Sequence, residues 1–276
     1  MNNKLNDEAL EIRLDKRSKS LRKLAVKALE SGKRAHLGSA MSIIEIIRVI
    51  YDDYLNLNAD NLNDINRDRF ILSKGHGCLA QYVLLADKGI IDEQELKKFC
   101  QFDSILGGHP EYKKIPGVEA STGALGHGLA IGVGMAKAAR LQKRKSKIVV
   151  LMGDGEINEG SVWESAMSAS KHQLTNLTVL IDYNKIQSYG FLEEVINPEP
   201  LIKKWESFNF EVSEVNGHDV KELKKAFNKI NEKEPKVVIC HTIKGKGFPF
   251  AENNPNWHHK SNLTDEEINK MYESVL

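Results

Sequence analysis

The sequence predicts an α/β protein built around a parallel sheet with helices on both faces. Two continuous apolar runs, at residues 147–152 and 177–181, have the composition of strands that are buried on both faces. A helical pattern over residues 161–171 lies between them, as in a strand–helix–strand unit. Because strands and helices continue to alternate along the chain, we expect one open, doubly wound sheet.

The other elements follow from apolar periodicity, capping residues and turn residues. Helices are expected over residues 5–30, from residue 39 or 42 to 51, and over 79–87, 92–99, 125–139, 198–208 and 220–231, with a last helix after a Thr264–Glu267 capping box. Further strands are expected over residues 69–73, 210–215 and 236–241. Residues 103–122 form a long loop, which is uncommon unless it has a function. No repeat or linker divides the chain, so residues 1–276 are expected to form one domain.

Composition excludes several classes of protein. The 276 residues carry 39 Lys and Arg against 38 Asp and Glu, so the net charge of +1 gives no bulk attraction to nucleic acid or to an anionic membrane. No apolar run has the length of a membrane span, and the first residues contain no apolar signal region. The three cysteines, Cys78, Cys100 and Cys240, have no metal-binding spacing. We expect a cytoplasmic protein with reduced cysteines.

Polar side chains follow both strands of the central unit. Gly153-Asp154-Gly155 follows the first strand, and Asn184 follows the second. Ligands of open α/β sheets bind at the carboxyl ends of the strands, where these side chains would meet. Their carboxylate and amide oxygens suit Mg²⁺, and the glycines would let a diphosphate approach the backbone at a helix N-terminus. The alternative is structural: a tight Gly-Asp-Gly turn, with Asn184 in an Asx-turn or a helix cap.

Five histidines lie at glycine-rich breaks or expected strand ends: His36, His76, His109, His218 and His258. Imidazoles placed there suit sugar hydroxyls, phosphate or proton transfer, although a single loop histidine is commonly just solvated. Their spacing matches no zinc site. Lys244 and Lys246 lie in a further glycine-rich loop, where they would suit phosphate or simply face solvent.

Together these motifs resemble the N-terminal half of transketolase, and specifically the separately encoded N-terminal subunit of split transketolases. The resemblance extends over roughly residues 31–259. It rests on the stretches 68–76 (DRFILSKGH), 108–110 (GHP), 116–126 (PGVEASTGALG), 153–160 (GDGEINEG), 215–219 (VNGHD), 244–247 (KGKG) and 252–258 (ENNPNWH). Taken alone, the stretch at 153–160 would indicate only an enzyme of the thiamine diphosphate class.

The resemblance implies a thiamine-diphosphate-binding fold and a set of residue roles. Asp154, Asn184 and the backbone carbonyl of Ile186 would bind Mg²⁺ or Ca²⁺. His36, His109 and His258 would face substrate hydroxyls and assist proton transfer. For His218 a structural role is expected instead. The residues implied to hold the cofactor are His76, Gly123, Leu125, Gly155, Glu156, Asn184, Lys244 and His258.

The resemblance also implies a partner. In the family, the carboxylate that activates thiamine diphosphate lies in a following pyrimidine-binding domain, which the 17 residues after His259 would be too few to form. We therefore expect a separately encoded C-terminal subunit, with two copies of each chain and the cofactor between unlike chains. The expected reaction transfers a two-carbon ketol unit from a ketose, or its phosphate, to an aldose or its phosphate.

Three positions depart from the family pattern. His127 replaces the usual Gln, Ser188-Tyr189 replaces an aliphatic residue and Asp, and His36-Leu37-Gly38 lacks the usual Pro. These differences bear on the sugar substrate more than on the cofactor. Two alternatives stay open: the α-subunit of a 2-oxo-acid dehydrogenase, which shares the metal motif, and a non-catalytic transketolase-like protein.

Overall fold

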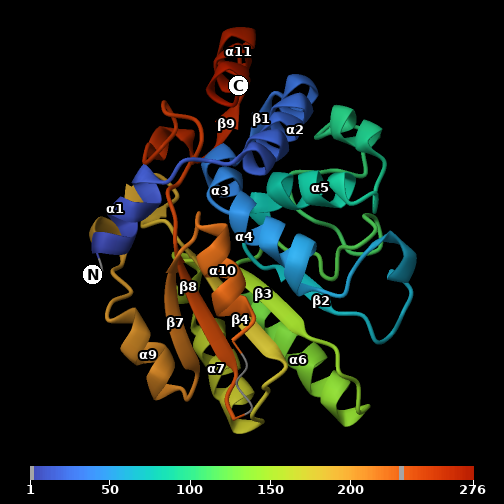
Figure 1. Ribbon diagram of the computed structural model, residues 1–276, viewed down its shortest axis with the longest axis vertical. Coiled ribbons are helices and arrows are strands. Elements are labelled where there is room, and N and C mark those ends of the chain that lie inside the picture. The colour runs from blue at the N-terminus through green and yellow to red at the C-terminus, as the bar shows by residue number, and fades with distance from the viewer. Residues whose placement is uncertain (1–2, 230–232) are drawn as a thin grey trace.

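The computed structural model describes residues 3–229 and 233–276 (Figure 1). Its centre is a sheet of five parallel strands in the order β2–β3–β4–β8–β7. The α/β class and the parallel sheet that the sequence predicts are thereby confirmed. The strands are β2 (Arg69–Leu72), β3 (Ile148–Gly153), β4 (Leu177–Tyr183), β7 (Glu211–Asn216) and β8 (Lys236–His241).

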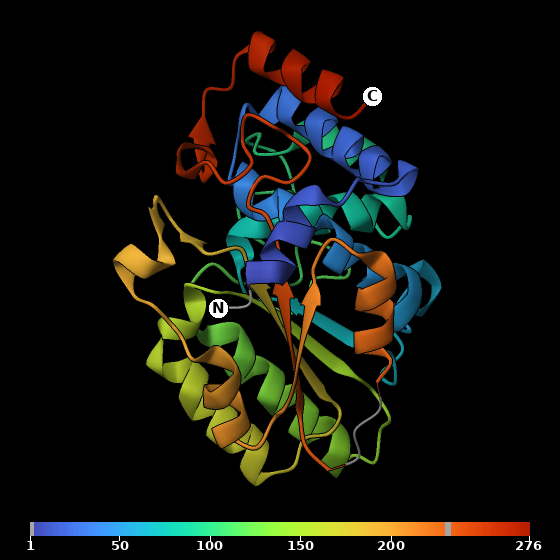
Figure 2. The same ribbon diagram turned by 60° about the vertical axis from the view of Figure 1, so that its left-hand side comes forward.

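Alternate residues of each strand enter two separate cores, as the pleat of a strand requires. In β3, Val149 and Leu151 belong to the first core, whereas Ile148, Val150 and Met152 belong to the second. Helices α2, α4, α5 and α10 cover the first core, and α6, α7 and α9 cover the second (Figure 2). Their bounds are α2 (Lys16–Gly32), α4 (Ile44–Val49), α5 (Cys78–Asp87), α6 (His127–Leu141), α7 (Gly160–Lys171), α9 (Leu201–Ser207) and α10 (Val220–Phe227).

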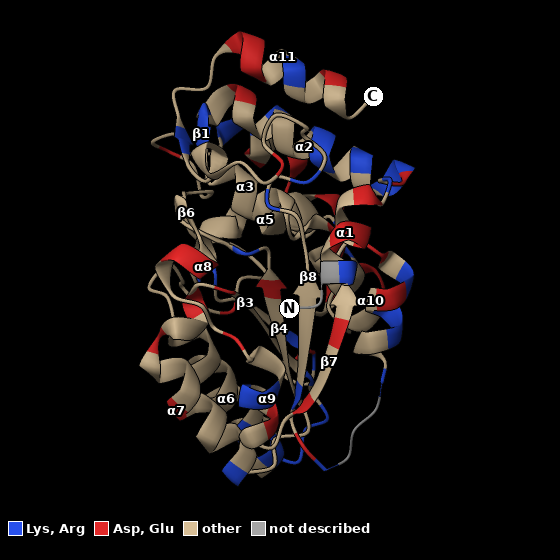
Figure 3. Cartoon of the chain, turned by 90° about the vertical axis from the view of Figure 1, so that its left-hand side faces the viewer, with Lys and Arg blue, Asp and Glu red and all other residues tan. Residues whose placement is uncertain are grey.

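A further layer lies beyond the carboxyl ends of the strands, toward which the strand arrows point (Figure 3). It contains α1 (Asn3–Glu11), α3 (Leu37–Met41) and α11 (Asp265–Ser274), which packs on α2. Within it, β1 (Arg34–Ala35) pairs antiparallel with β9 (Lys260–Ser261). This pairing places the segment that begins at His36 beside the segment that ends at His259.

The remaining elements are short. A hairpin of β5 (Ile186–Gln187) and β6 (Gly190–Phe191) follows β4 and leads into α8 (Leu192–Val195). Among the described residues, no helix combines the length and the apolar character needed to cross a bilayer. Single 3₁₀ turns occur at Ala59–Asn61, Gly75–Gly77, Glu156–Asn158 and Pro255–Trp257.

The N-terminal helices differ from the prediction. Residues 5–30 form two helices, because Asp15 is extended and caps α2 by accepting a hydrogen bond from the Ser18 N–H at 2.8 Å. The helix expected up to residue 51 starts earlier, at Leu37, and consists of α3, α4 and a π-helical turn at Ile50–Tyr54. Ser42 lies between α3 and α4, and its hydroxyl donates to Asp182 at 2.7 Å.

Other boundaries shift by a few residues. The helix expected at 92–99 is a 3₁₀ helix, Glu93–Lys98, although Asp92 caps it as predicted. The helix expected from Pro198 begins at Leu201. The helix expected over 220–231 ends at Phe227, and its last expected residues, 230 and 231, lie outside the described part of the chain. The Thr264–Glu267 capping box is confirmed, as is the loop at 103–122.

Candidate functional site

A pocket of about 240 Å³ opens where β3 and β4 end. Parallel strands bring their carboxyl ends to one edge of the sheet, so loops that are distant in sequence converge there. The pocket is lined by all twelve residues to which the resemblance assigns a role in binding metal, cofactor or substrate, whereas Lys246 and His218 do not line it. The twelve are His36, His76, His109, Gly123, Leu125, Asp154, Gly155, Glu156, Asn184, Ile186, Lys244 and His258. Their shared location is what the predicted roles require, and the roles themselves stay predictions.

Two buried carboxylates, Asp154 and Asp182, lie near each other at the ends of β3 and β4. Gly153 pairs with Asp182 in the sheet register, and this pairing places Asp154 next to Asp182. Burial raises the pKa of Asp182, but the Lys74 ammonium, with which it forms an ion pair, and hydrogen bonds from Thr242 and Ser42 outweigh burial, so the net shift is downward. Asp182 is therefore a fully compensated anion.

Asp154 has much less compensation. Among the described residues, its carboxylate accepts hydrogen bonds from the backbone alone: from the Gly155 N–H at 2.8 Å and the Lys185 N–H at 2.6 Å. Burial and the nearby Asp182 charge raise the pKa of Asp154 to about 7. A nearby cation would stabilise the ionised form of such a buried carboxylate. Asn184 Oδ1, the second oxygen predicted to bind a cation, accepts a hydrogen bond from the Ile186 N–H at 3.1 Å.

These oxygens fit a hard divalent cation. The described residues contain no cluster of three His, Cys, Asp or Glu side chains with metal-binding geometry, so a cation here would depend on amide and carbonyl oxygens as well as on Asp154. One predicted ligand is already engaged: the Ile186 carbonyl accepts a hydrogen bond from Lys244 Nζ at 2.8 Å. Burial lowers the pKa of Lys244 to about 8. The Lys244 ammonium therefore lies against one of the three oxygens that are predicted to bind a cation.

Glu156 supports the turn that carries Asp154. Its two carboxylate oxygens accept hydrogen bonds from the Ser73 hydroxyl, from the Gly126 N–H at 3.0 Å and from the Gly153 N–H at 3.1 Å. It is buried, and burial raises its pKa. Although Glu156 lines the pocket, its hydrogen bonds go to the protein itself.

The imidazoles form one cluster around His36. Its ring centroid lies 5.4 Å from that of His76, 5.8 Å from His109 and 5.3 Å from His258. Gly123 permits this packing, because a Cβ there would lie 2.8 Å from the His109 ring and its φ is +139°. The cluster combines loops that follow β2 and β8 with the long loop at 103–122.

Burial keeps these imidazoles neutral. It lowers the pKa of His36 to about 4, with help from His259 and His109, and the pKa of His258 to about 3, with help from Lys244. The pKa of His76 is also well below its usual value, chiefly through burial. Neutral imidazoles can donate and accept hydrogen bonds, as sugar hydroxyls require.

Sequence reasoning missed several residues of the site. Ser39, Lys74 and Gln187 also line the pocket. His259 lies with its ring centroid 4.6 Å from that of His36, because of the β1–β9 pairing. Lys74 could have been identified from its place in the Lys-Gly-His stretch, whereas no local pattern indicates His259.

Two of the unusual positions also lie near the site. Ser188 lines the pocket. Tyr189 is 64% exposed, and its ring centroid lies 5.5 Å from that of His258. His127 is exposed at the start of α6 and does not line the pocket. The Ser188–Tyr189 replacement therefore lies at the pocket, whereas His127 does not line it.

A parallel sheet with a pocket at the carboxyl ends of its strands is the architecture expected of a thiamine-diphosphate-binding fold. Residues 15–275 match the transketolase thiamine diphosphate binding domain, and the chain belongs to this family. The prediction of a transketolase-type transferase subunit is thereby confirmed at the level of the family. The same result argues against the α-subunit of a 2-oxo-acid dehydrogenase.

Two curated relatives match nearly end to end. The chain is 43% identical over 255 residues to one of the subunits of the apulose-4-phosphate transketolase of Actinobacillus succinogenes, covering 92% of each chain. It is 34% identical over 244 residues to the 6-deoxy-6-sulfo-D-fructose transketolase subunit SqwG of a Clostridium species, covering 88% of this chain and 89% of that one.

Solved transketolases share the fold. All of this chain superimposes on the transketolase of Campylobacter jejuni with a TM-score of 0.85 and 31% identity. It covers only 43% of that protein's chain. A transketolase of Pichia stipitis, solved with fructose 6-phosphate, gives a TM-score of 0.87 at 29% identity, with 98% of this chain and 40% of that one covered.

Proposed function

We propose that this chain is the diphosphate-binding subunit of a two-component transketolase. The enzyme would transfer a two-carbon ketol unit from a ketose phosphate to an aldose phosphate, using thiamine diphosphate and Mg²⁺ or Ca²⁺. One observation carries the proposal: the pocket joins an under-compensated carboxylate, Asp154, to a cluster of neutral imidazoles. The first would anchor a cation and diphosphate, and the second would bind a polyhydroxylated substrate.

Each group has a task that its surroundings suit. Asp154, Asn184 Oδ1 and the Ile186 carbonyl would hold the cation, which would require Lys244 to turn toward the diphosphate. Gly155 would let the diphosphate approach the backbone. When bound, thiamine diphosphate supplies the electron sink for breaking and re-forming the carbon–carbon bond.

The remaining groups would complete the cofactor site and bind the sugar. His76, His258 and Glu156 would border the cofactor, with Gly123 and Leu125 against its aminopyrimidine. The neutral imidazoles of His36, His109 and His258 would bind sugar hydroxyls and accept or return a hydroxyl proton.

Relatives of matching length support a partner chain. The Actinobacillus relative, of which this chain covers 92%, is itself named as one subunit of its transketolase. We propose a pyrimidine-binding partner, two copies of each chain, and the cofactor between unlike chains. Relatives at 43% and 41% identity are named for apulose 4-phosphate, so this ketose phosphate is the first substrate to assay.

We also propose a single domain in the cytoplasm. The two cores share one sheet, so neither can form without the other. All three cysteines are free, and two of them, Cys78 and Cys240, are buried. Free cysteines are usual in a reducing compartment.

The test compares the chain alone with the reconstituted pair. The subunit encoded next to it is co-expressed, and mass photometry gives the composition of the complex. Ketol transfer is then assayed with thiamine diphosphate, Mg²⁺ and a panel of ketose phosphates that includes apulose 4-phosphate. We expect activity only from the complex. Full activity of the isolated chain would refute the two-component proposal, and a complex that binds the cofactor but turns over no ketose would support the non-catalytic alternative.

A further inference from the structure

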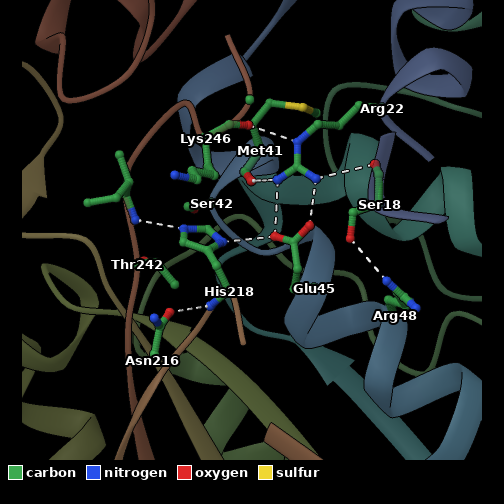
Figure 4. Close-up of polar contacts among 12 residues, drawn as sticks. Ser18, Arg22, Met41, Ser42, Glu45, Arg48, Asn216, His218, Thr242 and Lys246 are labelled. Atoms are coloured by element: carbon green, nitrogen blue, oxygen red, sulfur yellow. Dashed lines mark hydrogen bonds and ion pairs between the residues drawn. The ribbon is translucent and has the colours of Figure 1, made fainter. Parts of the chain in front are cut away.

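Three buried ionisable side chains form a cluster that does not line the pocket (Figure 4). Arg22 comes from α2, Glu45 from α4 and His218 from the turn after β7, and their exposed fractions are 0%, 1% and 4%. A buried ionic cluster is costly to form, and it is weak evidence of stabilisation by itself. Its hydrogen bonds, however, reach two segments that contribute residues to the pocket: α3 and the loop at 242–247.

Arg22 uses every donor that it has. Its Nε donates to the Lys246 carbonyl at 2.8 Å. Its two terminal nitrogens donate to both Glu45 oxygens, at 2.6 and 3.0 Å, and to the carbonyls of Ser18 and Met41, at 3.3 and 3.1 Å. A guanidinium has five N–H groups, and all five are engaged. Arg22 therefore connects α2, α3, α4 and the loop after β8.

The contacts of His218 define its tautomer. Nε2 lies 2.9 Å from the backbone N–H of Ile243, which can only donate, so Nε2 is the unprotonated nitrogen. Nδ1 carries the proton and donates to Glu45 at 2.8 Å. The charge of Glu45 is balanced by Arg22, and His218 is neutral. His218 thus links Glu45 to the backbone of the loop after β8.

The loop at 242–247 is held on both sides of Lys244. The Ile243 N–H is fixed by His218, the Lys246 carbonyl by Arg22, and the Gly245 N–H by the Gly38 carbonyl at 3.0 Å. The stem of Lys244 also packs closely on α3, since a Cβ at Gly38 would lie 2.9 Å from Lys244 Cγ. The Lys244 ammonium donates to the Ile186 carbonyl at 2.8 Å, and both residues line the pocket.

We propose that His218 is a positioning residue. Together with Glu45 and Arg22 it fixes the backbone on either side of Lys244, and so directs the Lys244 ammonium at the diphosphate end of the pocket. The proposal rests on the proposed function in one respect, that a diphosphate binds there. Without the His218–Ile243 hydrogen bond, the loop would have to become ordered at the moment of binding, and this entropy cost would weaken the affinity.

Three substitutions separate positioning from general stability. His218→Leu removes both hydrogen bonds with little change in volume. His218→Gln can restore an acceptor for Ile243 and a donor for Glu45. His241→Leu is the matched control. Within the part of the chain that the structure describes, His241 is the second buried histidine paired with a glutamate, Glu214 at 2.8 Å, and its ring makes no hydrogen bond to the loop at 242–247.

The main measurement is the Kd for thiamine diphosphate in the reconstituted complex with Mg²⁺. We expect His218→Leu to raise Kd by about tenfold or more, because the Lys244 ammonium would no longer be held in place for its charged contact with the diphosphate. His218→Gln should recover most of the affinity. His241→Leu should stay within about twofold, because the His241 ring hydrogen bonds to Glu214 and not to the loop. In a Lys244→Ala background, His218→Leu should have no further effect, because the two changes remove the same contact.

Hydrogen exchange of residues 242–247 in the isolated chain gives a readout that needs no cofactor. His218→Leu should accelerate exchange there, and His241→Leu should not. Equal exchange in both variants, or additive effects of His218→Leu and Lys244→Ala on Kd, would overturn the positioning role. If the wild-type complex fails to bind thiamine diphosphate, the proposed function falls, and the exchange data still decide whether His218 holds the loop.

Discussion

Two glycines of α6 offer a test of how tightly this helix packs on the sheet behind the site. A Cβ at Gly132 would lie 2.4 Å from Val150 Cγ2, whereas a Cβ at Gly134 would meet no atom within 4 Å. Val150 is fully buried in β3, four residues before Asp154. Gly132→Ala and Gly134→Ala therefore make the same chemical change on one helix in opposite surroundings.

The expected difference in stability follows from two terms. Each substitution gains about 1 kcal/mol of helix propensity, because alanine loses less backbone entropy than glycine. Only Gly132→Ala also overpacks the core, which costs about 1–3 kcal/mol. A valine has little freedom to rotate away, so the cost falls on the backbone of α6 or β3. Since the propensity term cancels, Gly132→Ala should be less stable than Gly134→Ala by about 1–3 kcal/mol.

Urea unfolding measures this difference. Far-UV circular dichroism and tryptophan fluorescence should give coincident transitions for each variant, which is the condition for comparing midpoints in a chain of this length. Gly134→Ala should have a higher midpoint than the wild type, and Gly132→Ala a lower midpoint than Gly134→Ala, with equal slopes. If Gly132→Ala matched or exceeded Gly134→Ala, the contact between α6 and β3 would be looser than the structure indicates.

Further predictions concern the site itself. Asp154→Ala should abolish Mg²⁺-dependent binding of thiamine diphosphate to the complex while leaving the circular dichroism spectrum unchanged. Calorimetry measures the affinity, and an unchanged affinity would exclude Asp154 as a metal ligand. Alanine at His36, His109 or His258 should lower kcat by about 10²-fold or more and change the cofactor Kd much less, as expected for a positioned acid or base. Near-normal rates in all three variants would show that these histidines have a structural role. Because the pKa values of His36 and His258 are lowered to about 4 and about 3, imidazole ¹⁵N spectra of the free chain should show both neutral from pH 8 to pH 5. The stability that these two histidines contribute is then complete above their unfolded pKa of about 6.5 and is lost as the pH falls below it; protonation near pH 6.5 in the spectra would contradict their burial.

Local patterns were sufficient wherever one segment determines its own structure. The apolar run at 147–152 became β3, the run at 177–181 became β4, and the Thr264–Glu267 box caps α11. Strands buried on both faces need continuous apolar side chains, and a helix start needs a side-chain acceptor for its free N–H groups. The N-terminal helices were predicted less well, because Asp15 caps a second helix inside a continuous amphipathic pattern.

The sequence by itself therefore determined the class of fold and, through its motifs, the family. Strand order placed Asp154 and Asn184 at one edge of the sheet, because the carboxyl ends of parallel strands meet there, and the resemblance implied the other residues that line the pocket. The tertiary structure decided what those residues touch. Lys74 compensates Asp182 across 108 residues of sequence, and His218 meets Glu45 across 173. Contacts of this kind depend on how helices and loops pack over the sheet, and no short-range pattern in the chain records them.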